Sequence, residues 1–291
     1  MKFYIVTPAY NAIEWLRRCV RSVADQVGEE VAVHHHVQDG GSADGTAEWL
    51  EDWRETHRGI SGYTFTYESG RDAGMYDALN QAWEKLPEDA DVTAHLNADE
   101  QYLPNALHQV VQEFHRKPDT DIVLGTFIIL NPDGSYHCHR RPVRPQAWRS
   151  KLFCEMITCS CFHKASTFRK HGVRCDATYK SIGDLIFFSD IMKTSPRVCV
   201  KPELLTSAYA MTGSNLAWTP ATERDFERYY AKLSKMEVRV AGIVRRAVNF
   251  TRRIVDCFCA PPKEVVIYQG NDTMRTVQVV DNPTCRWKIR S

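Results

Sequence analysis

The sequence predicts an α/β protein with a Rossmann-like, mainly parallel, doubly wound sheet, followed by a helical C-terminal extension. Two observations carry this prediction. Four short apolar strands alternate with four amphipathic helices over residues 1–116, and each of those strands ends in a polar loop. Regular alternation of strand and helix is typical of parallel sheets with right-handed connections. A chain of 291 residues is long enough for one such domain and an appendage.

Hydrophobic periodicity locates the elements of this alternating region. Apolar residues recur at three- and four-residue steps from Ile13 to Val27, which is the spacing of one helix face. The later helices repeat this spacing, and Pro104 stands in a first helical turn, where proline is accepted. Strands are predicted over residues 2–7, 31–38, 63–68 and 92–96, and helices over 13–27, 46–56, 75–86 and 104–116.

The pattern changes after Asp121. An Asn131-Pro-Asp-Gly turn predicts a hairpin, and the long stretch that ends at Phe258 is predicted to be one helix. The tail from Pro261 is polar and leans toward strand. The remaining predictions are strands at 122–130, 136–140 and 198–211, helices at 167–171, 184–193 and 219–258, and an irregular segment at 141–165.

Composition excludes several classes of protein. Lys and Arg number 37 against 36 Asp and Glu, so the net charge of +1 does not favour binding to nucleic acid. A membrane span needs about 18 consecutive apolar residues, which no window of the sequence approaches. The first residues also lack the apolar stretch of a signal peptide. We therefore expect a cytoplasmic protein.

The ten cysteines raise the question of a metal site. Disulfide frameworks are typical of small secreted domains, which this chain does not resemble. One cluster supplies metal-type side chains within ten positions, but it lacks the paired CxxC spacing of zinc sites. Buried free thiols are the favoured interpretation, and zinc is the alternative. The cluster is Cys154, Cys159, Cys161 and His163.

Polar segments follow each of the first four strands. Because the carboxyl ends of parallel strands meet at one edge of the sheet, these segments are expected to form one ligand crevice. Together they offer carboxylates, glycine backbone amides and one arginine, which suits a nucleotide diphosphate with a divalent cation. The segments are TPAYN at 7–11, QDGGSADG at 38–45, GRDAG at 70–74 and NADE at 97–100.

Single residues in these segments have two interpretations each. Asp39 either accepts a hydrogen bond from a pyrimidine base or serves in the turn that follows its strand. Arg71 either pairs with a diphosphate as a planar fork or forms a surface ion pair with Asp72. Asp99 and Glu100 end a strand, where hard oxygens suit Mg²⁺ or Mn²⁺.

Four motifs resemble, in their order and spacing, those of family 2 glycosyltransferases of the GT-A fold. They are TPAYN, DGGSADGT, RDAGMYDALNQAW and LNADE. The closest resemblance is to the colanic-acid type, which builds bacterial exopolysaccharides and O-antigens. HKASTFRKHG, YKSIGDLIFF and YAMTGSN follow in the same order. The resemblance implies a GT-A domain at 1–216, with a nucleotide-binding half at 1–100 and an acceptor-binding half at 101–216. Residues 217–291 would be a helical extension and tail.

The resemblance also implies a nucleotide-sugar donor, with a UDP-sugar favoured by the role of Asp39 as reader of the base. The first acid of the family's DxD motif is Asn97 in this chain, so binding of Mn²⁺ or Mg²⁺ rests on Asp99, with help from Glu100. The implied donor-binding residues are Thr7, Ala9, Tyr10, Asp39, Arg71, Asp72, Asn97, Ala98, Asp99 and His163.

Asp184 falls where the family keeps its catalytic base, and a helix N-cap is the alternative. As the base it would take a proton from the acceptor hydroxyl in a single displacement that inverts the anomeric centre. His163 either contacts a phosphate or the acceptor, or is a packed core histidine. Gly213 and Ser214 match a family loop that approaches the sugar.

Arginines alternate with apolar side chains over residues 238–258. This pattern suits peripheral contact with a membrane surface, which lipid-linked acceptors would require. The alternative is packing on the protein's own domain with solvated arginines, for which Cys257 and Phe258 suit a core. The arginines are Arg239, Arg245, Arg246, Arg252 and Arg253.

The resulting expectation is an inverting, metal-dependent glycosyltransferase with a glycan or lipid-linked glycan acceptor, acting in the cytoplasm or at the inner face of the membrane. A nucleotidyltransferase would open with a glycine-rich, basic loop, where this chain has TPAYN. A catalytically inactive nucleotide-binding scaffold of a glycan-assembly complex is the alternative that Asn97 leaves open.

Overall fold

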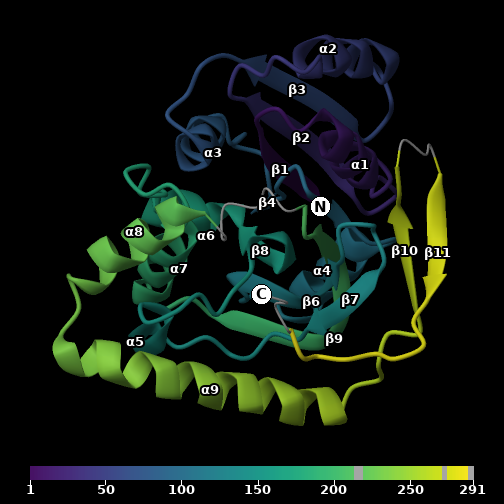
Figure 1. Ribbon diagram of the computed structural model, residues 1–291. Coiled ribbons are helices and arrows are strands. Elements are labelled where there is room, and N and C mark those ends of the chain that lie inside the picture. Colours follow the sequence, from purple (N-terminus) through teal and green to yellow (C-terminus); the bar gives the residue numbers. More distant parts are fainter. Residues whose placement is uncertain (213–218, 271–273, 288–291) are drawn as a thin grey trace.

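The computed structural model describes residues 1–212, 219–270 and 274–287. Its centre is a mixed sheet of nine strands within these residues, in the order β3-β2-β1-β4-β8-β6-β9-β5, with β7 paired to β6 (Figure 1). The strands of this sheet are β1 (Lys2–Ala9), β2 (Ala32–Asp39), β3 (Tyr63–Ser69), β4 (Val92–His95), β5 (Glu100–Tyr102), β6 (Ile122–Leu130), β7 (Tyr136–Arg140), β8 (Cys161–Lys164) and β9 (Val198–Ala210).

Helices cover both faces of the sheet, as expected for a doubly wound α/β fold. Along β1, Phe3 and Ile5 face α1, α2 and α4, whereas Tyr4 and Val6 face α3, α6 and α7. This alternation follows from the two-residue period of a strand. The helices are α1 (Ile13–Ala24), α2 (Thr46–Thr56), α3 (Met75–Glu84), α4 (Ala106–Arg116), α5 (Ala147–Ser150), α6 (Ala165–His171), α7 (Gly183–Lys193), α8 (Pro220–Tyr230) and α9 (Lys235–Cys257).

Strands β1 to β4 are parallel, and their carboxyl ends lie at one edge of the sheet. The register pairs Ala9 with Asp39 and Asp39 with Ser69, and the Leu96 N–H donates to the Val6 carbonyl at 3.0 Å. The loops after these four strands therefore start side by side, as the sequence predicts for a parallel sheet.

Two strands lie in segments where the sequence predicted none. β8, within the segment expected to be irregular, pairs antiparallel with both β4 and β6 and so joins the two halves of the sheet. β5 pairs antiparallel with β9. Both strands are too short for a two-residue hydrophobic period to become visible, which explains why sequence reasoning missed them.

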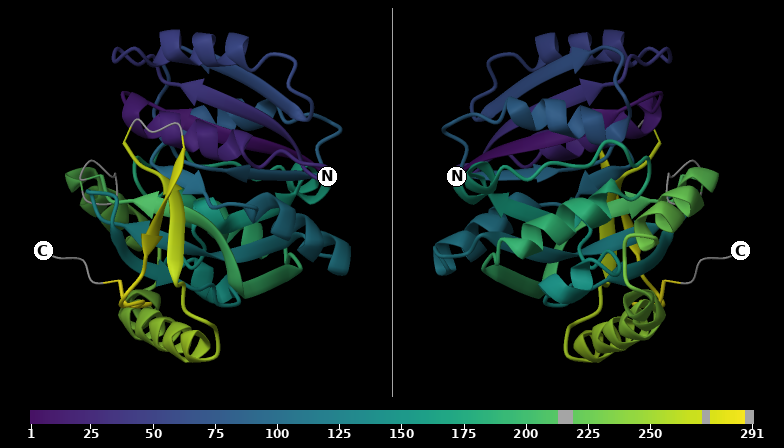
Figure 2. Two further views of the ribbon diagram at one scale, coloured as in Figure 1. Left: turned by 90° about the vertical axis from the view of Figure 1, so that its right-hand side faces the viewer. Right: turned by 90° about the vertical axis from the view of Figure 1, so that its left-hand side faces the viewer.

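The C-terminal extension consists of two helices and a hairpin rather than one long helix. Ser234 ends the break between α8 and α9, where its side chain and that of Glu237 form a reciprocal capping box. The tail forms a hairpin of β10 (Glu264–Tyr268) and β11 (Arg275–Val279) (Figures 1 and 2). Val265 and Ile267 of this hairpin pack in one cluster with Ile128 of β6 and Ala208 of β9.

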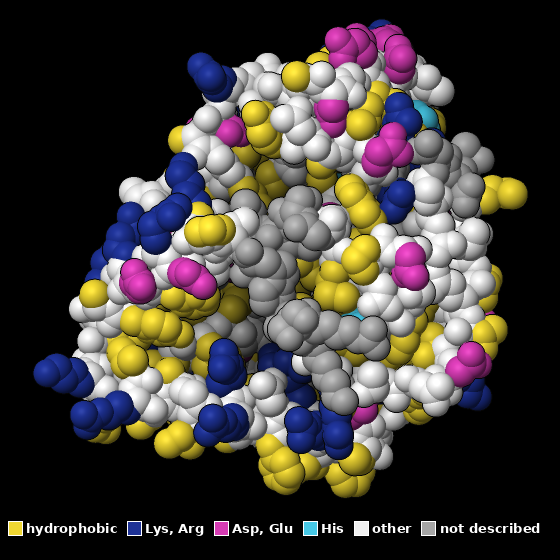
Figure 3. Space-filling view, viewed as in Figure 1, with side chains coloured by type: hydrophobic (Ala, Val, Ile, Leu, Met, Phe, Trp, Pro, Cys, Tyr) yellow, Lys and Arg dark blue, Asp and Glu magenta, His cyan; other side chains and the backbone are white. Residues whose placement is uncertain are grey.

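Helix α9 runs along the outside of the molecule, below the sheet in both views of Figure 2. Its inner side is narrow: Ala241 and Val248 pack against Val143, Leu152 and Phe153. Figure 3 shows dark blue basic side chains and yellow hydrophobic ones gathered along the lower edge, where α9 runs in Figure 1. Within the described ranges, no helix is both long and apolar enough to cross a membrane.

One of the five arginines expected on the solvent face of this helix is buried. Arg252 donates to the carbonyls of Arg141 and Glu155 at 3.2 and 2.9 Å, and burial lowers its pKa to about 9. Conversely, Phe258, expected to suit a core, is 86% exposed. The helix therefore packs on its own domain, but not through the residues that favoured this interpretation.

Candidate functional site

The loops after β1 and β2 are tied to each other by hydrogen bonds. The Asn11 N–H donates to Ser42 Oγ at 2.7 Å, and the Ala43 N–H donates to Asn11 Oδ1 at 2.8 Å. Asp44 accepts from the Ile13 N–H at 3.0 Å and from Thr46 Oγ1 at 2.6 Å, so it links the starts of α1 and α2. These bonds hold the first two loops in one arrangement.

Asp39 connects the second loop to the third. Its carboxylate accepts from the hydroxyls of Ser42 and Ser69, both at 2.5 Å, and the side chain is fully buried. The turn chemistry predicted as the alternative role of Asp39 is therefore present. A Cβ at Gly40 would lie 2.9 Å from Asp72 Oδ2, so the second and third loops approach each other closely at this glycine.

The third loop presents a cation to solvent at the start of α3. Arg71 is exposed, and no carboxylate in the described ranges lies within ion-pairing distance of its guanidinium. Asp72, the ion-pair partner considered in the sequence, instead accepts from the Gly74 N–H at 2.8 Å. Arg71 is therefore placed to meet an anion from solvent.

A second cation, which sequence reasoning missed, reaches the same loop. The exposed Lys180 donates from Nζ to the Ala73 carbonyl at 2.5 Å. The signal was available, because Lys180 stands four residues before Asp184 in the quoted segment YKSIGDLIFF. Two positive side chains thus flank the N-terminus of α3, whose dipole also favours negative charge.

Asp184 lies beside this loop, in the first turn of α7. Its Oδ1 accepts from the Leu185 N–H at 2.9 Å and from the Tyr76 hydroxyl at 3.4 Å, and Cys154 Sγ lies 3.8 Å from Oδ2. Burial of this carboxyl raises its pKa. The cap of α7 is Ile182, so the N-cap role predicted as the alternative does not apply.

Glycine at position 183 brings α7 against α3. A Cβ there would lie 2.6 Å from the ring of Tyr76. Tyr76, in the first turn of α3, therefore contacts both the helix start and the carboxylate of Asp184. This contact joins the start of α7 to the helix that follows the Arg71–Gly74 loop.

The fourth loop contains the motif at Asn97, Ala98 and Asp99. Asn97 Oδ1 is buried and has no hydrogen-bond partner in the part of the chain that the structure describes. Glu100, the expected helper in metal binding, is instead turned inward: it is almost fully buried, and its Oε2 accepts from the Asn97 N–H at 2.7 Å. Burial and the nearby charge of Asp99 raise the pKa of Glu100.

These residues fit a divalent cation in a specific way. A buried amide oxygen without a partner is costly unless a ligand, an ion or water satisfies it. One carboxylate and one amide oxygen, completed by diphosphate oxygens and water, is a donor set that Mg²⁺ accepts. Asn97 and Asp99 are thus the residues that would hold the metal, whereas Glu100 is not.

The three predicted donor-binding residues at the end of β1 differ in their exposure. Thr7 is fully buried, and its hydroxyl lies 2.9 Å from His35 Nε2, between β1 and β2. Ala9 is buried at the end of β1, whereas Tyr10 is 66% exposed.

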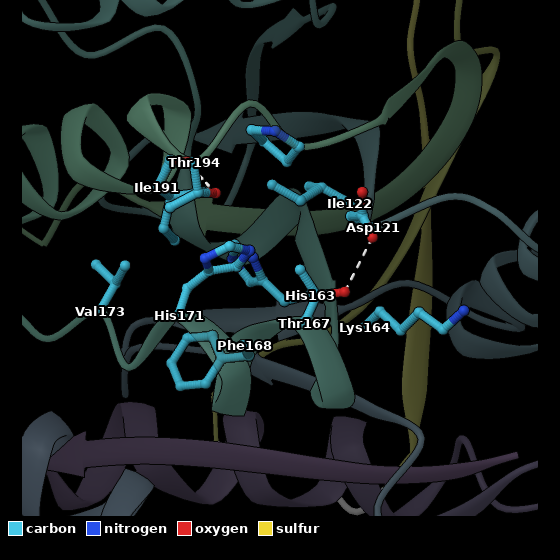
Figure 4. A pocket seen from close by; sticks show the side chains of 11 residues that line it. Asp121, Ile122, His163, Lys164, Thr167, Phe168, His171, Val173, Ile191 and Thr194 are labelled. Atoms are coloured by element: carbon cyan, nitrogen blue, oxygen red, sulfur yellow. Dashed lines mark hydrogen bonds between the residues drawn. The ribbon is translucent and has the colours of Figure 1, made fainter.

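His163 lies at the opposite edge of the sheet. It pairs with Thr93 near the amino end of β4, four residues before Asn97. There it lines a pocket with Phe168 and Ile191 (Figure 4), and burial lowers its pKa to about 4. Its 6% exposure is that of a packed core histidine, the alternative considered in the sequence, and the side chain does not lie among the loops that follow β1 to β4. β8 runs antiparallel to β4, which places His163 far from the loops.

The cysteines near His163 do not gather around a common point. All ten cysteines of the chain are free thiols. Among the residues that the structure describes, no three His, Cys, Asp or Glu side chains gather as they would around a metal ion. Gly213 and Ser214, expected near the sugar, lie outside the described residues.

Comparison with protein families identifies the family to which this chain belongs. A family model described as glycosyl transferase family 2 matches residues 4–172, more than half of the chain. The chain belongs to glycosyl transferase family 2. The match spans all four loops and the strands from β1 to β8. A search of curated proteins finds no match.

Solved structures support the GT-A fold of this family 2 chain. The S. aureus TarS structure matches with a TM-score of 0.59 at 12% identity, covering 86% of this chain and 43% of that one. TarS 1–349 in complex with UDP-GlcNAc matches with a TM-score of 0.62 at 14% identity, covering 79% of this chain and 64% of that one. A third structure is the mannosyltransferase PcManGT from Pyrobaculum calidifontis in complex with GDP-Man and Mn²⁺. It matches with a TM-score of 0.55 at 18% identity, covering 79% of this chain and 63% of that one. The family 2 chain thus spans less than half of the full TarS chain.

Proposed function

We propose that this glycosyltransferase is an inverting, metal-dependent enzyme that transfers a sugar from a nucleotide diphosphate, a UDP-sugar, to a glycan or lipid-linked glycan of the bacterial exopolysaccharide or O-antigen type. One observation carries the proposal. The half-buried carboxyl of Asp184 and the exposed cation Arg71 belong to two helix starts that Tyr76 joins. A base and a site for a departing anion therefore lie at the same edge of the sheet.

Asp184 performs the proton transfer in this proposal. Its carboxylate takes the proton of the acceptor hydroxyl while that oxygen attacks the anomeric carbon from the face opposite the diphosphate. The bond between the anomeric carbon and the diphosphate oxygen breaks, and its electron pair leaves with the nucleotide diphosphate. The raised pKa of Asp184 makes it a stronger base than an exposed aspartate.

Arg71 and Lys180 stabilise the departing group. Negative charge grows on the diphosphate as the bond breaks, and fixed cations aimed at that charge lower the barrier. A divalent cation held by Asn97 and Asp99 would supply further Lewis-acid stabilisation of the same charge. The PcManGT complex with GDP-Man and Mn²⁺ and the TarS complex with UDP-GlcNAc support a metal-assisted nucleotide-sugar donor.

Calorimetric titration tests the donor and the metal together. UDP, GDP and dTDP are titrated, each with and without Mn²⁺, into wild type, Asp99→Ala and Asp119→Ala. Asp119 is the matched control, because its exposed carboxylate lies beside Pro118 at the far edge of the sheet. The expected result is UDP binding that requires Mn²⁺, is lost in Asp99→Ala and is retained in Asp119→Ala.

Other outcomes contradict parts of the proposal. A preference for GDP would overturn the UDP assignment but keep the transferase. Binding of no nucleotide by the folded protein would favour the inactive scaffold. A working enzyme also hydrolyses its donor slowly without acceptor, whereas a scaffold leaves a bound donor intact.

A further inference from the structure

The outward face of α9 carries a continuous apolar stripe that nothing in the described residues covers. Met236, Ile243 and Phe250 follow one another at seven-residue steps, which is two helical turns, and Ile254 lies on the same side. Met236 is 74% exposed, Ile243 64% and Phe250 62%. Soluble proteins seldom expose apolar side chains in a row, so the stripe indicates a contact surface.

A stripe of arginines runs directly beside the apolar one. Arg239, Arg246 and Arg253 also follow at seven-residue steps, and all three are exposed. A helix that lies flat in a membrane interface has this arrangement, with apolar side chains inserted and long basic side chains reaching the headgroups.

The two acidic residues of α9 are turned away from this face. Glu237 pairs with Lys151, and Asp256 pairs with the buried Arg141 at 2.6 Å and with His139 at 2.6 Å. The outward face therefore presents positive charge without compensating carboxylates from its own helix, so it is complementary to an anionic surface.

A second copy of the chain fits this face less well. Packing two such helices together would bring the arginine stripe of one against that of the other, and like charges at close range are destabilising. A plane of anionic phospholipid accommodates both stripes at once. Figure 2 shows α9 at the outer margin of the molecule, where a flat surface can reach it.

We propose that the outward face of α9 binds an anionic phospholipid bilayer, with Met236, Ile243, Phe250 and Ile254 in the acyl boundary and Arg239, Arg246 and Arg253 on lipid phosphates. The helix lies in the plane of the membrane and keeps its contacts with the sheet. This proposal rests on the surface of α9 and does not depend on the transfer reaction.

Vesicle flotation with the full chain tests it. One set of vesicles is pure phosphatidylcholine, and the other contains phosphatidylglycerol as a third of the lipid. Wild type is expected to float only with the anionic vesicles and to be released by high salt. Arg246→Gln should weaken binding about fivefold, the share of one arginine near an anionic surface.

Arg245→Gln is the matched control for the arginine stripe. Arg245 carries the same charge on the same helix, but it lies near Tyr230 of α8 and not on the outward face. It should bind the vesicles as wild type does, and equal loss in both variants would overturn the assigned orientation.

The apolar stripe is tested with Ile243→Glu/Phe250→Glu, compared with Met274→Glu at an exposed position near the hairpin. The double variant should lose more than tenfold in binding, because both apolar side chains leave the acyl boundary. Thermal unfolding of each variant confirms that the protein folds. Wild type that fails to float, or a concentration-dependent dimer abolished by the double variant, would overturn the proposal.

Discussion

Asp184 is held by contacts that keep its carboxylate oriented while leaving it able to accept a proton. Oδ1 accepts from the Leu185 N–H and the Tyr76 hydroxyl, whereas the one partner of Oδ2 among the described residues is the Cys154 thiol at 3.8 Å. A carboxylate with one oxygen fixed and the other weakly engaged suits a general base.

Asp184→Asn is expected to lower kcat by about 10²–10⁴-fold and to leave the affinity for the donor nearly unchanged, because the amide cannot accept the proton. Steady-state kinetics and nucleotide titration check both parts. Asp190→Asn is the control on the same helix, since the side chain of Asp190 is 42% exposed and pairs with Lys193. Full activity in Asp184→Asn would remove this residue from the mechanism.

The pH profile provides a second test of the same residue. Burial raises the pKa of Asp184, so the carboxylate becomes protonated at a higher pH than an exposed aspartate, whose pKa is about 3.9. The kcat/KM of wild type should therefore fall as pH decreases through this raised pKa. An acidic limb at or below the ordinary aspartate value would contradict the assignment.

The raised pKa of Glu100 predicts that the stability of the folded protein depends on pH. Burial and the charge of Asp99 raise its pKa in the folded protein above the unfolded value of 4.5, so the folded state retains a proton that the unfolded chain releases. The free energy of unfolding should therefore decrease as pH rises above 4.5. Glu100→Gln removes this dependence, and its stability relative to wild type should be higher at pH 8 than at pH 4.5.

Urea unfolding at the two pH values measures the Glu100 effect. Each unit of pKa shift corresponds to about 1.4 kcal/mol. Glu88→Gln serves as the control, since Glu88 is 95% exposed. The same difference from wild type at both pH values would show that Glu100 ionises normally.

At the scale of elements, the contact between α3 and α7 depends on Gly183. Gly183→Ala places a methyl group 2.6 Å from the Tyr76 ring, so either the ring or the helix start must move. We expect a loss of about 1–3 kcal/mol in stability from overpacking. Activity should also fall, because both Asp184 and Tyr76 shift.

Gly242→Ala is the contrasting substitution. Gly242 lies inside α9, and nothing is within 4 Å of the position that an alanine methyl group would take. Alanine there should stabilise the protein by about 0.5–1 kcal/mol, because glycine is a poor helix former. Denaturant unfolding of both variants measures the pair, and destabilisation by Gly242→Ala would show that the face of α9 is not open.

The sequence best predicted the elements in which the spacing of hydrophobic residues is regular over many positions. The bounds of α2, β6 and β7 were predicted to the residue, because each has uninterrupted periodicity or a clear turn beside it. The break before α9 was missed, although Ser234-Lys-Met-Glu237 is a readable capping-box sequence. β8 could not be predicted, because a four-residue strand is defined by its partners and not by its own pattern.

The same distinction applies to the candidate site. The sequence predicted which loops meet, because strand order and direction follow from the alternating pattern. It did not predict where single side chains point. Thr7 and Glu100 are turned inward, and His163 lies near the amino end of β4 because its position depends on β8. The direction of a side chain within a loop depends on hydrogen bonds to residues that are distant in the sequence.

At the scale of the whole molecule, the sheet is continuous across the two halves inferred from the sequence. β4, from residues 1–100, is flanked by β1 and by β8, which comes from the later half. Removing either half would therefore expose the hydrogen-bonding groups of a central strand. The two halves are expected to share one folding transition, although they serve different substrates in the proposed reaction.

Calorimetry checks this expectation. The full chain should unfold in one transition whose calorimetric and van't Hoff enthalpies agree. UDP at 100 times its Kd, with Mn²⁺, should stabilise the folded state by about 2.7 kcal/mol and move the whole transition upward. A single transition is expected because β8 pairs with both β4 and β6, so that unfolding of one half removes hydrogen-bond partners from the other. Two separate transitions, of which the nucleotide moves only one, would show that the halves fold independently and that the β4–β8 pairing contributes little to cooperativity.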